Sequence, residues 1–337
     1  MKDVFSKIPK VFILLLNWNN WHETEECLKS LEKVDYQNFE VIVVDNGSNE
    51  RPPINPPTSP LAPLSPRSLG EAGLNKERGV GGEVAKRGRV ELICNDTNLG
   101  FAGGNNVGIR YALAHGADYV LLLNNDAVAA PDFLTELMKA AESNPSFGIL
   151  GSRIYAYGTN NIIFEGGKVN RWLTSGEHAT CNMQYAIYKV VDYITGAAML
   201  VKREMIEKIG MMREEYFLYY EDVDWCVRAK KTGYKCVLVP TSKVWHKVSA
   251  TTKEGSPSYI YYHTRNSLML AKFNGNCIQK TAAYILGAWI LLKQLPKFLL
   301  VVSLPNHCAD KRIWATSMIQ GVGDFYRGKY GKYAYRN

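Results

Sequence analysis

The sequence predicts an α/β protein with a mostly parallel central sheet, flanked by helices and followed by a helical C-terminal tail. Three short runs, 11–16, 41–44 and 120–123, have the continuous hydrophobicity of strands that are covered on both faces. Helical patterns alternate with these runs, which is typical of a parallel sheet. Polar clusters follow two of the runs, at Asp45 and at Asn124, and ligands bind at such strand ends.

The remaining elements follow from local patterns. Apolar residues recur at helical spacing from Cys27 to Val34 and again, after Pro131, from Phe133 to Ala141. The glycine-rich segment 98–106 predicts a turn that leads into a helix from about Asn106 to Ala114. Further along, we expect a strand with a flanking turn at 190–203, helices at 205–209 and 223–232, and short strands at 237–239 and 244–245.

Composition and length predict a globular protein with one interruption. The chain has 337 residues, of which 46% are hydrophobic and 21% charged. Seven cysteines are scattered without a C-x-x-C pair, so their spacing indicates neither a disulfide framework nor a zinc site. Seven of the fourteen prolines lie between Pro52 and Pro66. We therefore expect a domain at 1–275 that contains a disordered, low-complexity insertion at 51–90.

The region 276–337 is predicted to be a helical, basic tail that associates with a membrane. Residues 280–337 carry nine Lys or Arg and two Asp, which accounts for +7 of the net charge of +8. The stretch 284–304 is largely apolar but is interrupted by Lys293, Pro296 and Lys297. It predicts either a helix lying in a membrane interface or a buried amphipathic helix pair. An anionic membrane suits this charge better than nucleic acid does, because no compact basic stripe is present elsewhere.

Three groups of acidic or potential metal-binding residues lie in order along the chain. Asp126 follows a buried strand, where a carboxylate can bind a divalent cation. Glu221 and Asp222 begin a helix, where one carboxylate can take a proton from a hydroxyl. Asp224 lies four residues before Arg228 and is expected to pair with it, which leaves Asp222 as the base. His246 follows a short strand and could supply an imidazole for Mn²⁺ or Mg²⁺.

These groups also have a purely structural explanation. Asx turns and helix caps account for many Asn and Asp residues after strands. The helix dipole alone favours acidic residues at a helix start. Only the order and spacing of the segments make the set specific. These segments are LNWN (16–19), VVDNGS (43–48), NLGFAGGNN (98–106), LLLNNDA (121–127), TGAAMLV (195–201), YYEDVDWCVRAKKTGY (219–234), WH (245–246) and YYHTRN (261–266).

Taken in order, the segments resemble the family 2 inverting glycosyltransferases of the GT-A fold, in particular the bacterial rhamnosyltransferase-like members. The resemblance covers 11–45 and 90 to about 273. It implies transfer of a sugar from a nucleotide sugar (dTDP-, UDP- or GDP-linked) to a hydroxyl of a glycan or lipid-linked acceptor, with inversion, in cell-surface polysaccharide synthesis. The expected location is cytoplasmic, peripheral at the inner face of the cell membrane.

The resemblance also implies roles for individual residues. Asp222 would be the catalytic base, and Asp126 and His246 would bind a divalent cation, Mn²⁺ or Mg²⁺. The metal motif begins with Asn124 rather than Asp, which offers the cation one charge less. The donor would be bound by Asn17, Asp45, Asn98, Gly100, Asn105, Asn124, Gly196, Glu221 and Arg265, with Arg265 at the diphosphate.

Two other functions fit parts of the pattern. A sugar nucleotidyltransferase shares a nucleotide-binding α/β half, but its first strand is followed by a Gly-rich loop with Arg or Lys. Here that place holds Asn17, Trp18 and Asn19. A catalytically inactive scaffold that binds nucleotide sugars would have lost the carboxylate of Asp126 or Asp222, and both are present.

Overall fold

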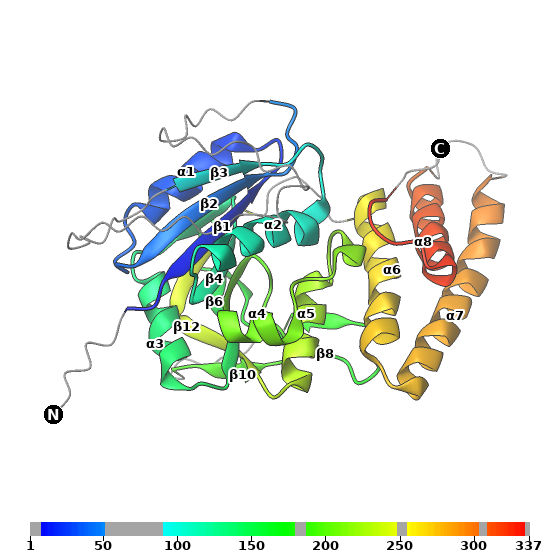
Figure 1. Cartoon of the computed structure of the whole chain (residues 1–337). Coiled ribbons are helices and arrows are strands. Elements are labelled where there is room, and N and C mark those ends of the chain that lie inside the picture. The colour runs from blue at the N-terminus through cyan, green and yellow to red at the C-terminus, as the bar shows by residue number, and fades with distance from the viewer. Residues whose placement is uncertain (1–7, 51–89, 179–186, 248–254, 303–308, 334–337) are drawn as a thin grey trace, which may run out of the picture.

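The computed structural model describes residues 8–50, 90–178, 187–247, 255–302 and 309–333. The predicted insertion at 51–90 therefore lies outside the described residues except for Val90. A large mixed sheet with helices on its faces forms one side of the molecule, and long C-terminal helices form the other (Figure 1).

Within the described residues, the large sheet has ten strands. They are β1 (Val11–Asn17), β2 (Phe39–Asp45), β3 (Val90–Cys94), β4 (Tyr119–Asn124), β5 (Ala127–Ala129), β6 (Phe147–Ala156), β7 (Ile162–Phe164), β10 (Lys189–Val191), β11 (Ala198–Lys202) and β12 (Lys235–His246). The order is β10-β12-β6-β11-β4-β1-β2-β3, with β5 on β12 and β7 on β6. The strands β3-β2-β1-β4 are all parallel, β12 is parallel to β6, and β11 runs antiparallel between β4 and β6. A separate hairpin pairs β8 (Gly167–Val169) with β9 (Gly176–His178).

The helices are α1 (Trp21–Leu31), α2 (Gly100–Ala114), α3 (Phe133–Ser143), α4 (Arg203–Ile209), α5 (Glu221–Lys231), α6 (Pro257–Asn274), α7 (Cys277–Val302) and α8 (Ala309–Arg327). The predicted α/β architecture with a C-terminal helical tail is confirmed. The central strands are as buried as their composition predicts, and β1 and β4 lie almost wholly in the core.

Three elements differ from the prediction. Helix α2 begins at Gly100, so the glycine-rich segment is helical instead of a turn. Its glycines allow close packing on the sheet, because a Cβ at Gly104 would lie 2.5 Å from Leu16 Cδ1. The segment 190–203 holds two strands, β10 and β11, that pair with different neighbours. The two strands expected at 237–239 and 244–245 are one strand, β12, with an irregularity between Val239 and Lys243.

The C-terminal helices α6, α7 and α8 pack against one another beside α5 (Figure 1). They enclose a second hydrophobic cluster, formed by Tyr216, Leu268, Met269, Ala271, Ala283, Val322 and Phe325. Helix α6 therefore joins the sheet domain to the tail, although it lies before the boundary predicted at residue 275. Within the residues that the structure describes, none of the helices combines the length and hydropathy needed to cross a membrane.

Candidate active site

The residues of the predicted metal motif converge where β4 and β12 end. Strand β5 pairs with the last residues of β12, which places His246 opposite Ala127 and next to the turn that holds Asp126. His246 Nε2 lies 2.9 Å from Asp126 Oδ1 and 3.0 Å from Asn124 Nδ2. Asp126 is only 6% exposed. Residues more than 100 positions apart in the sequence are thus brought together by strand pairing.

This donor set fits a divalent cation. A carboxylate and an imidazole are suitable ligands for Mn²⁺ and similar ions. Two adjacent ligands that each lie about 2.1 Å from a six-coordinate ion are about 3.0 Å apart, which is close to the Asp126–His246 separation. Asp126 and His246 would therefore hold the ion, with the side chain of Asn124 beside them.

Asn17 and Asp45 lie side by side at the neighbouring ends of β1 and β2. Asn17 Nδ2 donates to Asp45 Oδ1 and to Ser48 Oγ, each at 3.2 Å. Asn17 Oδ1 accepts from Thr24 Oγ1 at 3.1 Å, and Thr24 Oγ1 in turn accepts from Asn125 Nδ2 at 2.9 Å. A hydrogen-bonded path therefore connects the predicted nucleotide end of the site with the metal motif.

Asn46, which the sequence reasoning did not single out, organises the segment at Asn98. Its Nδ2 donates to Asn98 Oδ1 at 3.0 Å and to Gly100 O at 3.1 Å, and its Oδ1 accepts from Leu99 N at 3.1 Å. The side chain is 2% exposed. The signal in the sequence was its place in the polar cluster after the second strand.

The start of α2 is held against the segment that precedes α5. Gly100 has a φ of +78°, and a Cβ there would lie 2.4 Å from Phe217 O, so only glycine fits. Phe101 N donates to the same carbonyl at 2.6 Å. Asn105 is 2% exposed, and its Nδ2 donates to Phe101 O within the helix. Asn105 therefore supports the start of α2 from inside.

Asp222 lies in the first turn of α5 beside Gly196. Its Oδ2 accepts from Gly196 N at 3.0 Å. A Cβ at Gly196 would lie 2.8 Å from the ring of Phe101, so a larger residue would push these elements apart. The next residue, Ala197, accepts from Asn124 N at 3.0 Å. The predicted base and the metal motif are thus joined through two consecutive residues that precede β11.

The predicted pairing of Asp224 with Arg228 is confirmed, with 2.7 Å between Oδ2 and Nε. Asp224 is fully buried and also accepts from Tyr216 Oη at 3.2 Å and from Asn274 Nδ2 at 2.6 Å. It is therefore a structural carboxylate that ties α5 to α6. The half-buried Asp222 is the member of the acidic cluster that stays next to the site.

Glu221 is buried, with 4% of its surface exposed. Burial, and then the neighbouring carboxylates Asp222 and Asp224, raise its pKa well above the usual range. Its Oε2 has no hydrogen-bond partner among the described residues. Burial of this kind favours the protonated form of the carboxyl.

Arg265 does not lie with the other predicted donor-binding residues. Its side chain is fully buried in α6, and its N–H groups donate to Asn266 Oδ1, to Tyr261 Oη and to the carbonyls of 215, 216 and 331. All five donors of the guanidinium are used in this way. The expectation that Arg265 contacts the diphosphate is therefore not supported, because a guanidinium with every donor occupied has none left for phosphate.

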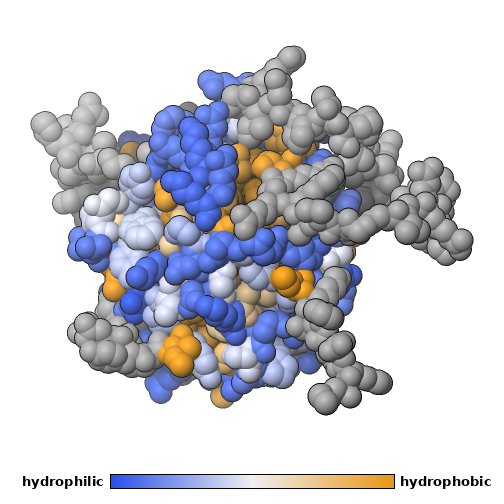
Figure 2. Space-filling model, turned by 90° about the vertical axis from the view of Figure 1, so that its left-hand side faces the viewer, coloured by the Kyte–Doolittle hydropathy of each residue, from blue (hydrophilic) through white to orange (hydrophobic). Residues whose placement is uncertain are grey.

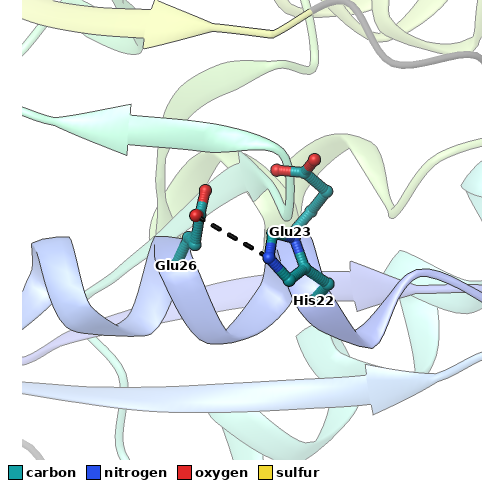
Figure 3. Close-up of side chains that lie close together, drawn as sticks. All are labelled: His22, Glu23 and Glu26. Atoms are coloured by element: carbon teal, nitrogen blue, oxygen red, sulfur yellow. Dashed lines mark ion pairs between the residues drawn. The ribbon is translucent and has the colours of Figure 1, made fainter.

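A different set of metal-capable side chains lies on α1. Among the described residues, only His22, Glu23 and Glu26 form a group of three with ligand atoms within 4.8 Å of one another (Figure 3). Lys247 Nζ lies 2.6 Å from Glu23 Oε2 and also contacts Glu26. Its hydrogen bond lowers the pKa of Glu26. The ammonium group of Lys247 thus already compensates negative charge in this cluster, and it links α1 to the end of β12.

The sequence matches two family models. The model described as "Glycosyl transferase family group 2" matches residues 119–318, which is more than half of the chain. The model described as "Glycosyl transferase family 2" matches residues 12–53. Together they cover the strands other than β3, the metal motif and the acidic helix.

Among characterised relatives, the chain is similar to the dTDP-rhamnosyl transferase RfbF of Shigella flexneri, with 28% identity over 200 residues, 55% of this chain and 64% of that protein. The chain thus spans less than two thirds of that relative. It is also similar to the N-acetylglucosaminyl-diphospho-decaprenol L-rhamnosyltransferase of Mycobacterium tuberculosis, with 26% identity over 55% of this chain and 67% of that protein.

One solved structure with a similar fold is the mannosyltransferase PcManGT from Pyrobaculum calidifontis, in complex with GDP-Man and Mn²⁺. The TM-score is 0.55 at 14% identity, and the match covers 96% of this chain and 89% of that one. This likeness confirms the GT-A fold that the sequence motifs predicted.

Proposed function

Because the chain belongs to glycosyl transferase family group 2, we propose that it transfers a sugar from a nucleotide sugar to a hydroxyl group of a glycan or lipid-linked acceptor. The transfer inverts the anomeric carbon, needs a divalent cation and serves the synthesis of a cell-surface polysaccharide. The observation that carries this proposal is the position of Asp222 beside Gly196, one residue from the backbone contact to Asn124.

In the proposed reaction Asp222 is the general base. A carboxylate oxygen of Asp222 takes the proton from the acceptor hydroxyl as its oxygen attacks the anomeric carbon. The bond between that carbon and the diphosphate oxygen breaks, and the nucleoside diphosphate leaves. The base and the departing group lie on opposite faces of the sugar, which gives inversion in one displacement.

Asp126 and His246 would hold the cation in this site. Such an ion, when bound, neutralises negative charge on the leaving diphosphate. The solved mannosyltransferase of similar fold was determined with Mn²⁺, which supports this choice of cofactor. Asn17, Asp45, Asn98 and Asn124 remain the proposed contacts to the donor. The first two and Asn124 end β1, β2 and β4, and Asn98 is bonded to Asn46, which follows β2.

For the donor and acceptor we propose the chemistry of the relatives. The Shigella protein is named for a dTDP-linked rhamnose donor, and the mycobacterial protein for an acceptor on a polyprenyl diphosphate. A dTDP-deoxysugar and a lipid-linked glycan are therefore the first pair to test, ahead of UDP- and GDP-linked donors.

The surface that we propose to bind the membrane lies on α7, which forms the outer side of the helical region (Figure 1). One side of α7 exposes a hydrophobic stripe whose members are half to largely accessible: Ile278, Ile285, Trp289, Leu292 and Leu299. Lys293 Nζ lies 3.6 Å from the ring of Trp289. The opposite side of the molecule is mostly hydrophilic, with small hydrophobic areas (Figure 2). We propose that α7 lies against the anionic inner face of the cell membrane.

The test begins with a screen of dTDP-, UDP- and GDP-sugars for protection against thermal unfolding, with and without Mn²⁺. Turnover of the donor that protects is then measured with the wild type and with Asp222→Asn. We expect the variant to bind the donor and to lose about 10²–10⁴-fold in turnover, the usual contribution of a general base. Asp132→Asn, at an exposed position before α3, is the matched control. Near-normal turnover by Asp222→Asn would reject the assignment of the base.

A further inference from the structure

The segment from Glu215 to Tyr220, which leads directly into the acidic helix, has an unusual backbone. Phe217, Tyr219 and Tyr220 all have positive φ angles, of 66°, 66° and 74°. Side chains with a Cβ rarely adopt this conformation, and it persists only where surrounding contacts impose it. Asp222 follows two residues after this segment, so the direction of its side chain depends on how the segment is held.

The contacts that hold the segment come from two adjacent residues of α6. Asn266 Nδ2 donates to the carbonyls of Tyr216, Leu218 and Tyr219 at 3.1, 2.8 and 2.8 Å. Arg265 Nη2 donates to the carbonyls of Glu215 and Tyr216 at 3.3 and 2.9 Å. Both side chains are fully buried. Four carbonyls of the segment are therefore bound from the same side.

The remaining carbonyls of the segment are bound by the elements of the site. Phe217 O accepts from Phe101 N at the start of α2, and Tyr220 O accepts from Asp224 N in the first turn of α5. Every carbonyl from Glu215 to Tyr220 thus has a donor. These donors belong to α6, to the start of α2 and to the first turn of α5.

Arg265 and Asn266 also hold each other. Arg265 Nε donates to Asn266 Oδ1 at 2.9 Å, which orients the amide so that its Nδ2 faces the carbonyls. The guanidinium lies over the rings of Tyr261 and Tyr262, with centroid distances of 5.1 and 5.2 Å. Tyr261 Oη in turn donates to Asp324 on α8 at 2.8 Å. The pair is therefore fixed by packing and by hydrogen bonds on every side.

We propose that Arg265 and Asn266 are positioning residues that set the orientation of the catalytic carboxylate of Asp222 by holding the segment 215–220, in which three residues have positive φ angles. The proposal rests on the role of Asp222 proposed above. It assigns to this buried pair a function in the reaction without any contact to donor or acceptor. The reason is geometric: the segment runs directly into the first turn of α5, which carries Asp222.

The experiment uses the full chain with Asn266→Ala, Arg265→Lys and the control Met269→Ala. Met269 is fully buried on the same helix and belongs to the second hydrophobic cluster, so its truncation destabilises α6 without removing a donor to the segment. Arg265→Lys keeps the charge but replaces the planar fork with a single ammonium. All variants are compared at a temperature at which their circular dichroism spectra match that of the wild type.

Two readouts separate positioning from general destabilisation. The kcat of Asn266→Ala and Arg265→Lys is expected to fall by about 10- to 100-fold, as a misplacement of about 1 Å does, while the KM for the donor stays within about twofold. Amide hydrogen exchange of the peptide spanning 215–222 is expected to be faster in both variants. Met269→Ala is expected to keep the wild-type kcat and to change exchange in that peptide less than either of the two variants does.

The proposal is overturned if the two variants keep the kcat of Met269→Ala, or if exchange in 215–222 does not change. A loss of donor affinity equal to the loss of kcat would also overturn it, because the pair would then act on binding. If the wild type transfers no sugar, the proposed function fails instead. The exchange measurement still decides whether the pair holds the segment.

Discussion

His263 is expected to make this protein less stable at low pH, because its buried surroundings disfavour the charged imidazole. It lies on α6, and its ring is 4.5 Å from that of Tyr219 and 4.1 Å from that of Tyr259. Its Nε2 is buried without a hydrogen-bond partner among the described residues. Burial lowers the pKa of His263 from 6.5 to about 4. The folded protein therefore holds this imidazole neutral under conditions in which an exposed histidine is charged.

The sign of the effect follows from proton binding in the two states. Between pH 6.5 and about 4 the unfolded chain takes up a proton at His263, whereas the folded chain does not. Stability therefore falls as the pH falls through 6.5, and the loss is complete near the folded pKa. A shift from 6.5 to about 4 corresponds to about 3 kcal/mol at about 1.4 kcal/mol per pH unit.

The assay is urea unfolding of the wild type and of His263→Phe at pH 7.5 and at pH 4.5. Phenylalanine keeps the aromatic packing and removes the titrating group. We expect the wild type to lose about 2.5 kcal/mol more than the variant between these pH values. His22→Gln is the control, because the side chain of His22 is 77% exposed and should give no such difference. Equal losses in the wild type and in His263→Phe would refute the argument.

Three further predictions concern the site and its attachment. EDTA should abolish transfer, and Asp126→Ala and His246→Ala should each raise the Mn²⁺ concentration needed for half-maximal rate; full activity in excess chelator would contradict this. Glu221→Gln should gain stability relative to the wild type as the pH rises from 5 to 8. The folded wild type keeps the proton on Glu221, whereas the unfolded chain loses it above a pKa of 4.5, so the wild type loses stability as the pH rises toward the raised pKa. An equal change in the stability of both proteins between the two pH values would count against it. Cosedimentation with anionic liposomes should weaken at high salt and when Trp289 and Leu292 are changed to Ser, whereas a protein that ignores every liposome would make α7 a protein contact surface.

The first half of the fold could be predicted because continuous runs of apolar residues indicate its buried strands. The runs at β1, β2 and β4 are apolar on both faces, so no tertiary information is needed to recognise them as central strands. Strand β6 was missed, since it mixes glycine, serine and arginine with apolar residues. Its strand character comes from pairing with β11 and β12, which are distant in the sequence.

The site was predictable to the extent that its residues follow strands. Asp45 and Asn124 come directly at strand ends, and parallel pairing then places them at one edge of the sheet. The start of α2 was not predictable by the same reasoning, because glycines in a sequence usually indicate a turn. Here tertiary packing overrides propensity: Gly108 would place a Cβ 3.0 Å from Leu14, so glycine lets the helix approach the sheet.

Arg265 shows why a motif alone does not give a role. A buried arginine beside a diphosphate-binding site and a buried arginine that binds main-chain carbonyls look the same in a sequence. The structure separates them, because Arg265 donates to Gly331 O as well as to the segment before α5, and Gly331 N donates to Glu215 O. The residues after α8 are therefore bonded to the segment that we propose to position Asp222. A chain ended near residue 276, which the tail's charge alone would mark as separable, would remove Gly331 and the packing of α8 on α6. One donor of a buried guanidinium would lose its acceptor, at about 1–3 kcal/mol, and α6 would be exposed along the face that α8 covers. The tail and the segment 215–220 are thus joined by packing and hydrogen bonds, so attachment of α7 to a membrane would act on the same helices that we propose to orient Asp222.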